Sequence, residues 1–176
     1  MKIMPTQKVP PLQIETVGRG VWTLKESNPE HFTLVIFYRG SHCVICRRYL
    51  TELNKKCAEF EKNGVNLIAI SADTKARAER AVKEWGLDAL TVGFSFDLHK
   101  AEDWGLFVSS RVERETVQEP EHFLEPGTFL INPDETLYAS SVQNMPFARP
   151  SVSELLEGVK FVTKERYPAR GNALVA

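Results

Sequence analysis

Short hydrophobic runs alternate along this chain with segments whose apolar residues follow helical spacing. The runs of strand length are rich in β-branched and aromatic residues and lie at 33–38, 65–70, 91–96 and 128–131. The first two are typical of buried strands. Between them, apolar residues recur at intervals of three and four from Cys46 to Phe60, which is one stripe of an α-helix. We therefore expect a helix over about 44–63, closed by Gly64.

The rest of the pattern extends this order of strands and helices. A charged helix is expected over 75–85, between a cap at Asp73 or Thr74 and Gly86. The order strand, helix, strand, helix implies a parallel pair of strands with a right-handed crossover. The shorter expected elements are an edge strand or hairpin arm at 20–24, a short helix at 98–104, a hairpin of 128–131 with 136–139, and a last helix to about 165 capped by Ser151 or Ser153.

Three segments show little periodicity. Residues 1–15 form a proline-rich lead that we expect to be irregular, and 166–176 form a tail. Residues 107–125 are rich in charge and predict a long, mobile loop with at most one short element, suited to a lid or a dimer contact. With 176 residues, 43% of them hydrophobic, the whole chain 1–176 is expected to form one domain.

The net charge and the search for targeting signals limit the classes of protein to which the chain can belong. The formal net charge is −1, which gives no electrostatic case for binding nucleic acid or an anionic membrane surface. Residues 1–12 contain prolines where a signal peptide has its apolar core, and no run approaches the length of a membrane span. We therefore expect a cytoplasmic protein. In that compartment a close cysteine pair is more often catalytic or metal-binding than a structural disulfide.

Two of the three cysteines, Cys43 and Cys46, lie where the first strand ends and the long helix begins. Gly40 and Ser41 break the strand just before them. A helix N-terminus offers free backbone N–H groups and the positive end of the helix dipole, and both stabilise a thiolate. The thiolate is the nucleophilic form of cysteine. A strand, a short turn, Cys-x-x-Cys and a long helix are typical of a thioredoxin-like redox site.

Further motifs make the resemblance more specific. The chain reads Phe-Tyr-Arg-Gly-x-x-Cys-x-x-Cys-Arg over 37–47, Pro-Gly-Thr-Phe-Leu-Ile-Asn-Pro-Asp over 126–134, and Phe-Ala-Arg-Pro over 147–150. From about 21 to 165 it resembles the peroxiredoxin-like branch of the alkyl hydroperoxide reductase and thiol-specific antioxidant family, in the thioredoxin superfamily. The resemblance implies an α/β, thioredoxin-like fold with a central mixed β-sheet flanked by helices.

The peroxiredoxin motif Pro-x-x-x-Thr/Ser-x-x-Cys ends in the cysteine that attacks the peroxide. With that cysteine at Cys46, the Thr position falls on Cys43 and the Pro position on Arg39, so the chain departs from the motif twice. Family members that read Phe-Tyr-Arg-Gly-x-x-Cys-Pro-x-Cys-Arg share both departures. This chain further has Val44 where those members have proline.

The resemblance implies a thiol peroxidase that reduces hydrogen peroxide or organic hydroperoxides. Cys46 would attack and form a sulfenic acid, and Cys43 would resolve it to a disulfide. Arg149, with Arg39, would lower the thiol pKa and donate to the peroxide oxygens.

The remaining site residues and the partners also follow from the resemblance. Pro126 and Gly127 match a segment in which a cis-proline often faces the cysteines, and are the expected substrate-binding residues. No metal or organic cofactor is implied. The implied reductant is thioredoxin, glutaredoxin or glutathione, and related folds often form homodimers.

Three alternatives stay open from the residues alone. In a thioredoxin-type disulfide oxidoreductase the roles reverse, and Cys43 attacks while Cys46 resolves. The pair also has zinc-finger spacing, although the sequence supplies no second pair of ligands. A redox-sensing module without turnover is the third. Cys57 lies about 16 Å from Cys46 along the expected helix, too far for a disulfide, and is expected to be a core residue.

Overall fold

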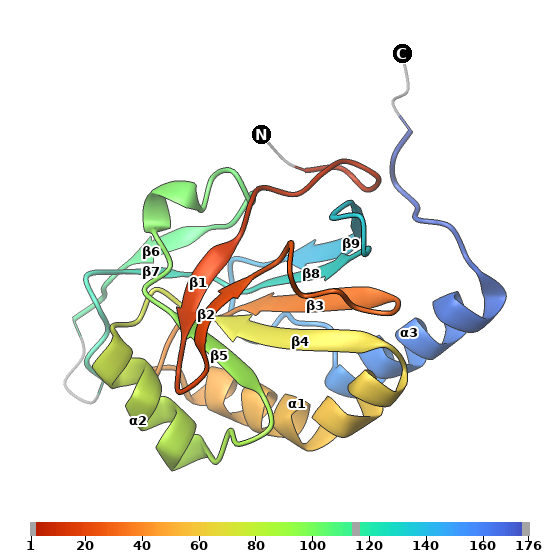
Figure 1. The fold of residues 1–176 in the computed structure, drawn as a ribbon. Helices are drawn as coiled ribbons and strands as arrows, with labels where there is room; N and C mark the ends of the chain where they lie inside the picture. The colour runs from red at the N-terminus through yellow and green to blue at the C-terminus, as the bar shows by residue number, and fades with distance from the viewer. Residues whose placement is uncertain (1–2, 114–116, 174–176) are drawn as a thin grey trace.

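A seven-stranded mixed sheet forms the centre of the structure, a computed structural model that describes residues 3–113 and 117–173 (Figure 1). Its strands are β1 (Gln13–Thr16), β2 (Gly20–Thr23), β3 (Phe32–Phe37), β4 (Val65–Ile70), β5 (Thr91–Phe94), β8 (Gly127–Ile131) and β9 (Leu137–Val142). Their order is β2-β1-β5-β4-β3-β8-β9. β3, β4 and β5 are parallel, whereas β8 runs antiparallel to β3 and β9. The expected mixed sheet, parallel pair and final hairpin are confirmed.

Both faces of the central strand β3 are buried. Leu34 and Ile36 point into a hydrophobic cluster that includes residues of α1 (Val44–Lys62), α2 (Lys75–Trp85) and α3 (Val152–Glu165). Val35 and Phe37 point into a second cluster on the opposite face. This alternation follows from the period of two along a strand. It explains why the sequence of β3 is apolar without interruption.

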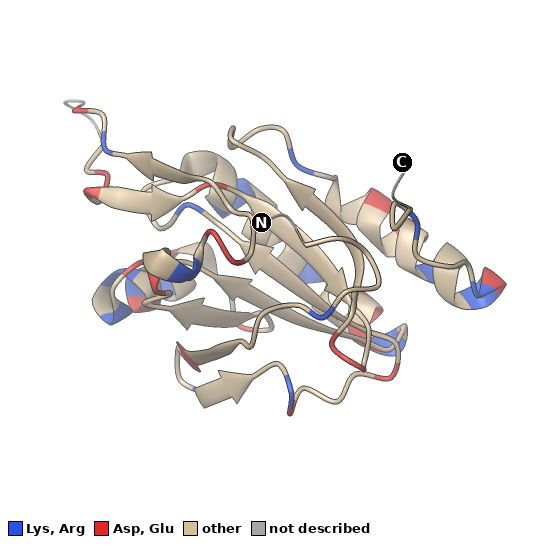
Figure 2. Ribbon diagram, turned by 90° about the horizontal axis from the view of Figure 1, so that it is seen from above, with Lys and Arg blue, Asp and Glu red and all other residues tan. Residues whose placement is uncertain are grey.

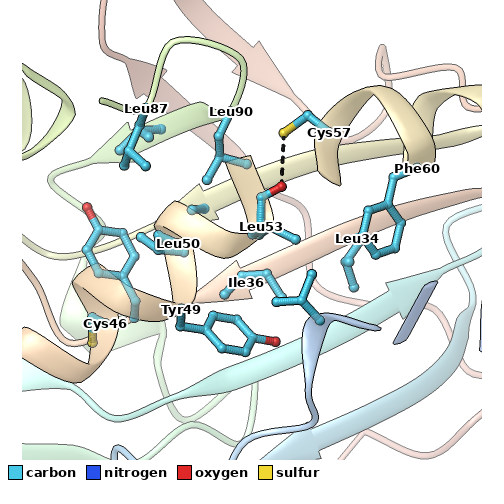
Figure 3. Packing of buried hydrophobic residues seen from close by; sticks show 14 of the residues in the cluster. Leu34, Ile36, Cys46, Tyr49, Leu50, Leu53, Cys57, Phe60, Leu87 and Leu90 are labelled. Atoms are coloured by element: carbon cyan, nitrogen blue, oxygen red, sulfur yellow. Dashed lines mark hydrogen bonds between the residues drawn. The ribbon is translucent and has the colours of Figure 1, made fainter. Parts of the chain in front are cut away.

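Helix α1 packs along the sheet with the stripe that the sequence predicts (Figure 3). Leu50, Leu53 and Phe60 are fully buried on this face. Cys57 is also buried, and its Sγ donates to the carbonyl of Leu53 at 3.5 Å. The expectation that Cys57 is a core residue is therefore confirmed.

Charged residues of both signs are interspersed over the helices and loops, and the central strands carry few of them (Figure 2). Among the residues that the structure describes, no helix is long and apolar enough to cross a membrane.

The last helix begins at the predicted cap, because the Ser151 hydroxyl accepts the Glu154 N–H at 3.1 Å.

Two predictions of irregular structure are wrong. Strand β1 begins inside the lead of residues 1–15, at Gln13, and pairs with β2 and β5; its Ile14 and Thr16 side chains alternate inward. Residues 107–125 form a two-stranded sheet of β6 (Val108–Ser110) and β7 (His122–Leu124) rather than a loop with at most one short element. Part of that segment, 114–116, lies outside the described residues. The short helix expected at 98–104 is the 3₁₀-helix η1 (Leu98–Lys100).

Candidate active site

The two cysteines of the motif lie at the N-terminus of α1, and both are free thiols. Cys43 is the N-cap residue and is 5% exposed, whereas Cys46 is fully buried. The Cys46 backbone N–H donates to Cys43 Sγ at 3.2 Å. The orphan N–H group of the first helical turn therefore stabilises negative charge on Cys43.

Arg149 brings a cation to the second cysteine. It lies in the loop between β9 and α3, and its Nη2 donates to Cys46 Sγ at 2.9 Å. Its Nε and Nη1 are buried without a hydrogen-bond partner among the described residues. The expected grouping of Cys43, Cys46 and Arg149 is thus present. Two guanidinium donors remain available there for the oxygen atoms of a ligand.

The surroundings of the two thiols lower the pKa of Cys43 and raise that of Cys46. The hydrogen bond from the Cys46 thiol lowers the pKa of Cys43 to about 6, with help from the Cys46 N–H, Arg149 and Arg39 against the effect of burial. Burial raises the pKa of Cys46 well above its ordinary value, and the hydrogen bond to Cys43 adds to this, while Arg149 opposes both. The pair therefore loses its first proton from Cys43 and keeps the second on Cys46.

Alkylation of the reduced protein tests this order. The rate at which iodoacetamide modifies Cys43 is expected to fall as the pH drops through about 6, because protonation removes the nucleophilic thiolate. Peptide mapping by mass spectrometry across pH 5 to 9 gives the rate for each cysteine. Cys57 serves as internal control, since burial raises its pKa to about 11 and it should stay unmodified. A Cys43 midpoint of about 8.5, the value of an unperturbed thiol, would contradict the prediction.

Arg39 lies at the end of β3 and contacts two carboxylates. Its Nε lies 3.3 Å from Glu125 Oε2 and its Nη2 lies 3.5 Å from Glu119 Oε1. Its guanidinium also lies 4.6 Å from the centre of the Phe123 ring. Arg39 therefore links the end of β3 to the segment around β7, where two carboxylates partly offset its charge. It still helps to lower the pKa of Cys43, as expected, and its contact with peroxide stays a prediction.

Pro126 and Gly127 lie at the start of β8 and contact neighbouring elements. No peptide bond among the described residues is cis, so Pro126 is trans. Its carbonyl accepts the backbone N–H of Gln143 at 2.9 Å. At Gly127 a Cβ would collide with the side chain of Leu106, so a small residue is needed for packing. Both residues serve strand pairing and packing, and their expected part in binding substrate stays a prediction.

Asp73 is a site residue whose role the sequence did not indicate. Its buried carboxylate accepts the Ser41 N–H at 2.6 Å and the Arg77 Nε–H at 2.8 Å. Gly40 fits beside it with φ 133°, and a Cβ there would lie 2.9 Å from the carboxylate oxygens. Of the two expected caps of α2, Asp73 and Thr74, Thr74 is the N-cap. The available signal was a carboxylate after the strand that neighbours β3, since parallel strands end at the same edge.

Within the described residues, no three His, Cys, Asp or Glu side chains are grouped so that they could hold a metal ion. The site described above consists of thiols, a guanidinium and the backbone of a helix N-terminus.

The mixed sheet with its flanking helices and the cysteine pair at the start of α1 define a thioredoxin-like α/β protein. A model of the AhpC/TSA family matches residues 5–140, and the chain belongs to that family. Alkyl hydroperoxide reductase C of Amphibacillus xylanus is 26% identical over 129 residues, which cover 73% of this chain and 64% of the relative. The chain thus spans slightly less than two thirds of the length of that curated relative.

Solved structures show the same fold at low identity. A peroxiredoxin-like protein from Aquifex aeolicus has a TM-score of 0.72 and 15% identity, covering 92% of this chain and 89% of its own. AhpC of Enterococcus faecalis has a TM-score of 0.72 and 13% identity, covering 97% and 99%. Peroxidoxin BcpB of Mycobacterium tuberculosis has a TM-score of 0.70 and 13% identity, covering 91% and 98%.

Proposed function

We propose that this protein is a thiol-dependent peroxidase that reduces hydrogen peroxide or organic hydroperoxides, with Cys46 as the attacking thiol. The observation that carries the proposal is the 2.9 Å hydrogen bond from Arg149 to Cys46 Sγ, beside two buried guanidinium donors without described partners. Such donors stabilise the negative charge that develops as an O–O bond breaks. Membership in the AhpC/TSA family and the name of the alkyl hydroperoxide reductase relative support the same chemistry.

The chemical steps account for the opposite acidities of the two cysteines. At rest Cys43 carries the charge and Cys46 the proton. When a peroxide occupies the Arg149 donors, the Cys46 proton passes to Cys43, and the Cys46 thiolate attacks one peroxide oxygen. The O–O bond breaks and the leaving oxygen takes the proton from Cys43, so water or an alcohol departs. The Cys43 thiolate then attacks the Cys46 sulfenic acid, hydroxide leaves as water with a solvent proton, and a disulfide forms.

A thiol reductant must restore the two cysteines, and we infer thioredoxin, glutaredoxin or glutathione. The surface next to the pair is open to such a partner, since Val44 directly after Cys43 is 72% exposed. A groove lined by Arg47, Arg48 and Trp85 continues from it along α1. A homodimer and a cytoplasmic location belong to the same proposal.

A thiol-disulfide oxidoreductase led by Cys43 is the second candidate. Two observations favour it: Cys43 has the lower pKa, and it is the more exposed residue of the pair. In that reaction the Cys43 thiolate attacks a substrate disulfide, and Cys46 releases the substrate thiol by attacking the mixed disulfide. The non-enzymatic redox sensor is a third reading of the same pair.

Trapping of sulfenic acid separates these functions. Cys43→Ser and Cys46→Ser receive stoichiometric hydrogen peroxide with a sulfenic-acid trap and are mapped by mass spectrometry, while peroxide consumption by the wild type is followed with excess dithiol. We expect trapping at Cys46 in Cys43→Ser and turnover in the wild type. Cys57→Ser is the matched control and should not alter turnover, because Cys57 is a buried core residue.

Each other result changes either the function or the roles of the two cysteines. A reactive Cys43 without peroxide consumption would favour disulfide exchange. Trapping at Cys43 in Cys46→Ser, together with turnover, would keep the peroxidase and reverse the two roles. Oxidation of the cysteines without turnover under any reductant would indicate a redox sensor.

A further inference from the structure

Arg149 reaches Cys46 from a loop, so something must hold it there. Loop side chains are positioned by the rigid elements that they contact. None of the ion pairs found among the described residues includes Arg149. Its described contacts near the thiols are the sulfur of Cys46 and the ring of Tyr49, whose centre lies 5.1 Å from the guanidinium carbon.

Tyr49 stands one helical turn after Cys46 on α1. Residues three apart on a helix are neighbours on one face, so both can contact the same guanidinium. Tyr49 is 9% exposed, and its hydroxyl is buried without a hydrogen-bond partner among the described residues. In Figure 3 that hydroxyl points away from the sulfur of Cys46. What Tyr49 offers Arg149 is therefore the face of its ring.

We propose that Tyr49 is a positioning residue that holds the Arg149 guanidinium against Cys46 through its ring face. This inference rests on the proposed peroxidase function, in which the guanidinium stabilises the negative charge that develops as the O–O bond breaks. The ring attracts the cation by its quadrupole, which leaves the positive charge in place for the thiolate and the peroxide.

A carboxylate partner would act differently from the ring. It would bind the in-plane N–H donors of Arg149 and offset the charge that favours the Cys46 thiolate. The ring face leaves Nε and Nη1 without partners, as found among the described residues. Tyr49 thus fixes the position of the Arg149 guanidinium without offsetting its charge or occupying its N–H donors.

Titration of Cys46 in variants of Tyr49 tests the proposal. A Cys43→Ser background leaves one site thiol, and its thiolate absorbance is followed against pH. Tyr49→Leu removes the ring and is expected to raise the Cys46 midpoint by about one unit, because the opposite charge is no longer held nearby. Tyr49→Phe keeps the ring face and is expected to restore the midpoint. In the wild-type background, Tyr49→Leu should lower kcat/KM for hydrogen peroxide by about tenfold, and Tyr49→Phe by less than about twofold.

The variant Phe60→Leu distinguishes a loss of packing from a loss of Arg149 positioning. It changes a residue on the same buried face of α1 that is remote from Arg149. It should lower the unfolding midpoint and leave the Cys46 titration unchanged. An unshifted titration in Tyr49→Leu, or a Tyr49→Phe variant as altered as Tyr49→Leu, would overturn the proposal. If the wild type reduced no peroxide but Tyr49→Leu still shifted the titration, the peroxidase function would fail and the positioning role would stand.

Discussion

Replacement of Arg149 by leucine is expected to lower kcat/KM for hydrogen peroxide by about a hundredfold to a thousandfold. The guanidinium donates to Cys46 Sγ at 2.9 Å and has two further buried donors beside it. Loss of one preorganised donor to a developing oxyanion costs about that factor in other enzymes. The same substitution removes a cation that favours the Cys46 thiolate. Steady-state peroxide consumption with a saturating dithiol measures the effect.

Two further variants show which property of Arg149 matters. Arg149→Lys keeps the charge but replaces the planar set of donors by a point charge, so its activity should lie between those of leucine and the wild type. Arg80→Leu changes an exposed arginine on α2 and is the matched control, with activity expected to stay at the wild-type value. If Arg149→Leu kept more than about a third of the wild-type kcat/KM, the attack would not depend on this cation. Cys43 would then become the better candidate for the nucleophile.

The elements that position the site could be predicted because they depend on local patterns. The stripe from Cys46 to Phe60 and the break at Gly40 set the start and the buried face of α1. The contact between Arg149 and Cys46 joins residues 103 positions apart. The periodic spacing of apolar residues along the chain cannot indicate such a pair. The contact was expected only because family motifs place both residues.

The rest of the site depends on partners that are distant in the sequence. Arg39 has the same local context whether it faces a peroxide or a carboxylate, and its pairing with Glu119 and Glu125 decides between the two. The short strands β6 and β7 are half polar, so their pairing with each other is not evident in their composition. Tyr49 contacts Arg149 only because the loop before α3 returns to the N-terminus of α1.

Replacement of Asp73 by alanine is expected to destabilise the reduced protein by about 3 kcal/mol, because it leaves part of the guanidinium of Arg77 and the Ser41 N–H buried without their acceptor. The Asp73 side chain is fully buried and that of Arg77 is 25% exposed, which places the cost at the lower end for a buried ion pair. Asp73→Asn keeps one oxygen as the acceptor for Ser41 but places an amide N–H2 group opposite the Arg77 Nε–H, so it loses the charge and that hydrogen bond. A destabilisation of about 2 kcal/mol is expected. Urea unfolding of the reduced proteins measures both.

The same substitution should also alter the cysteines, because Asp73 fixes the turn that leads into Cys43. With Ser41 released, Cys43 is less firmly held at the N-cap, and the pH midpoint of its alkylation is expected to rise from about 6. Asp103→Asn removes an exposed carboxylate and is the control, expected to change neither stability nor the midpoint. A destabilised Asp73→Ala protein with an unchanged Cys43 midpoint would restrict Asp73 to a purely structural role. A loss of stability below about 0.5 kcal/mol would show that the turn is held by other contacts.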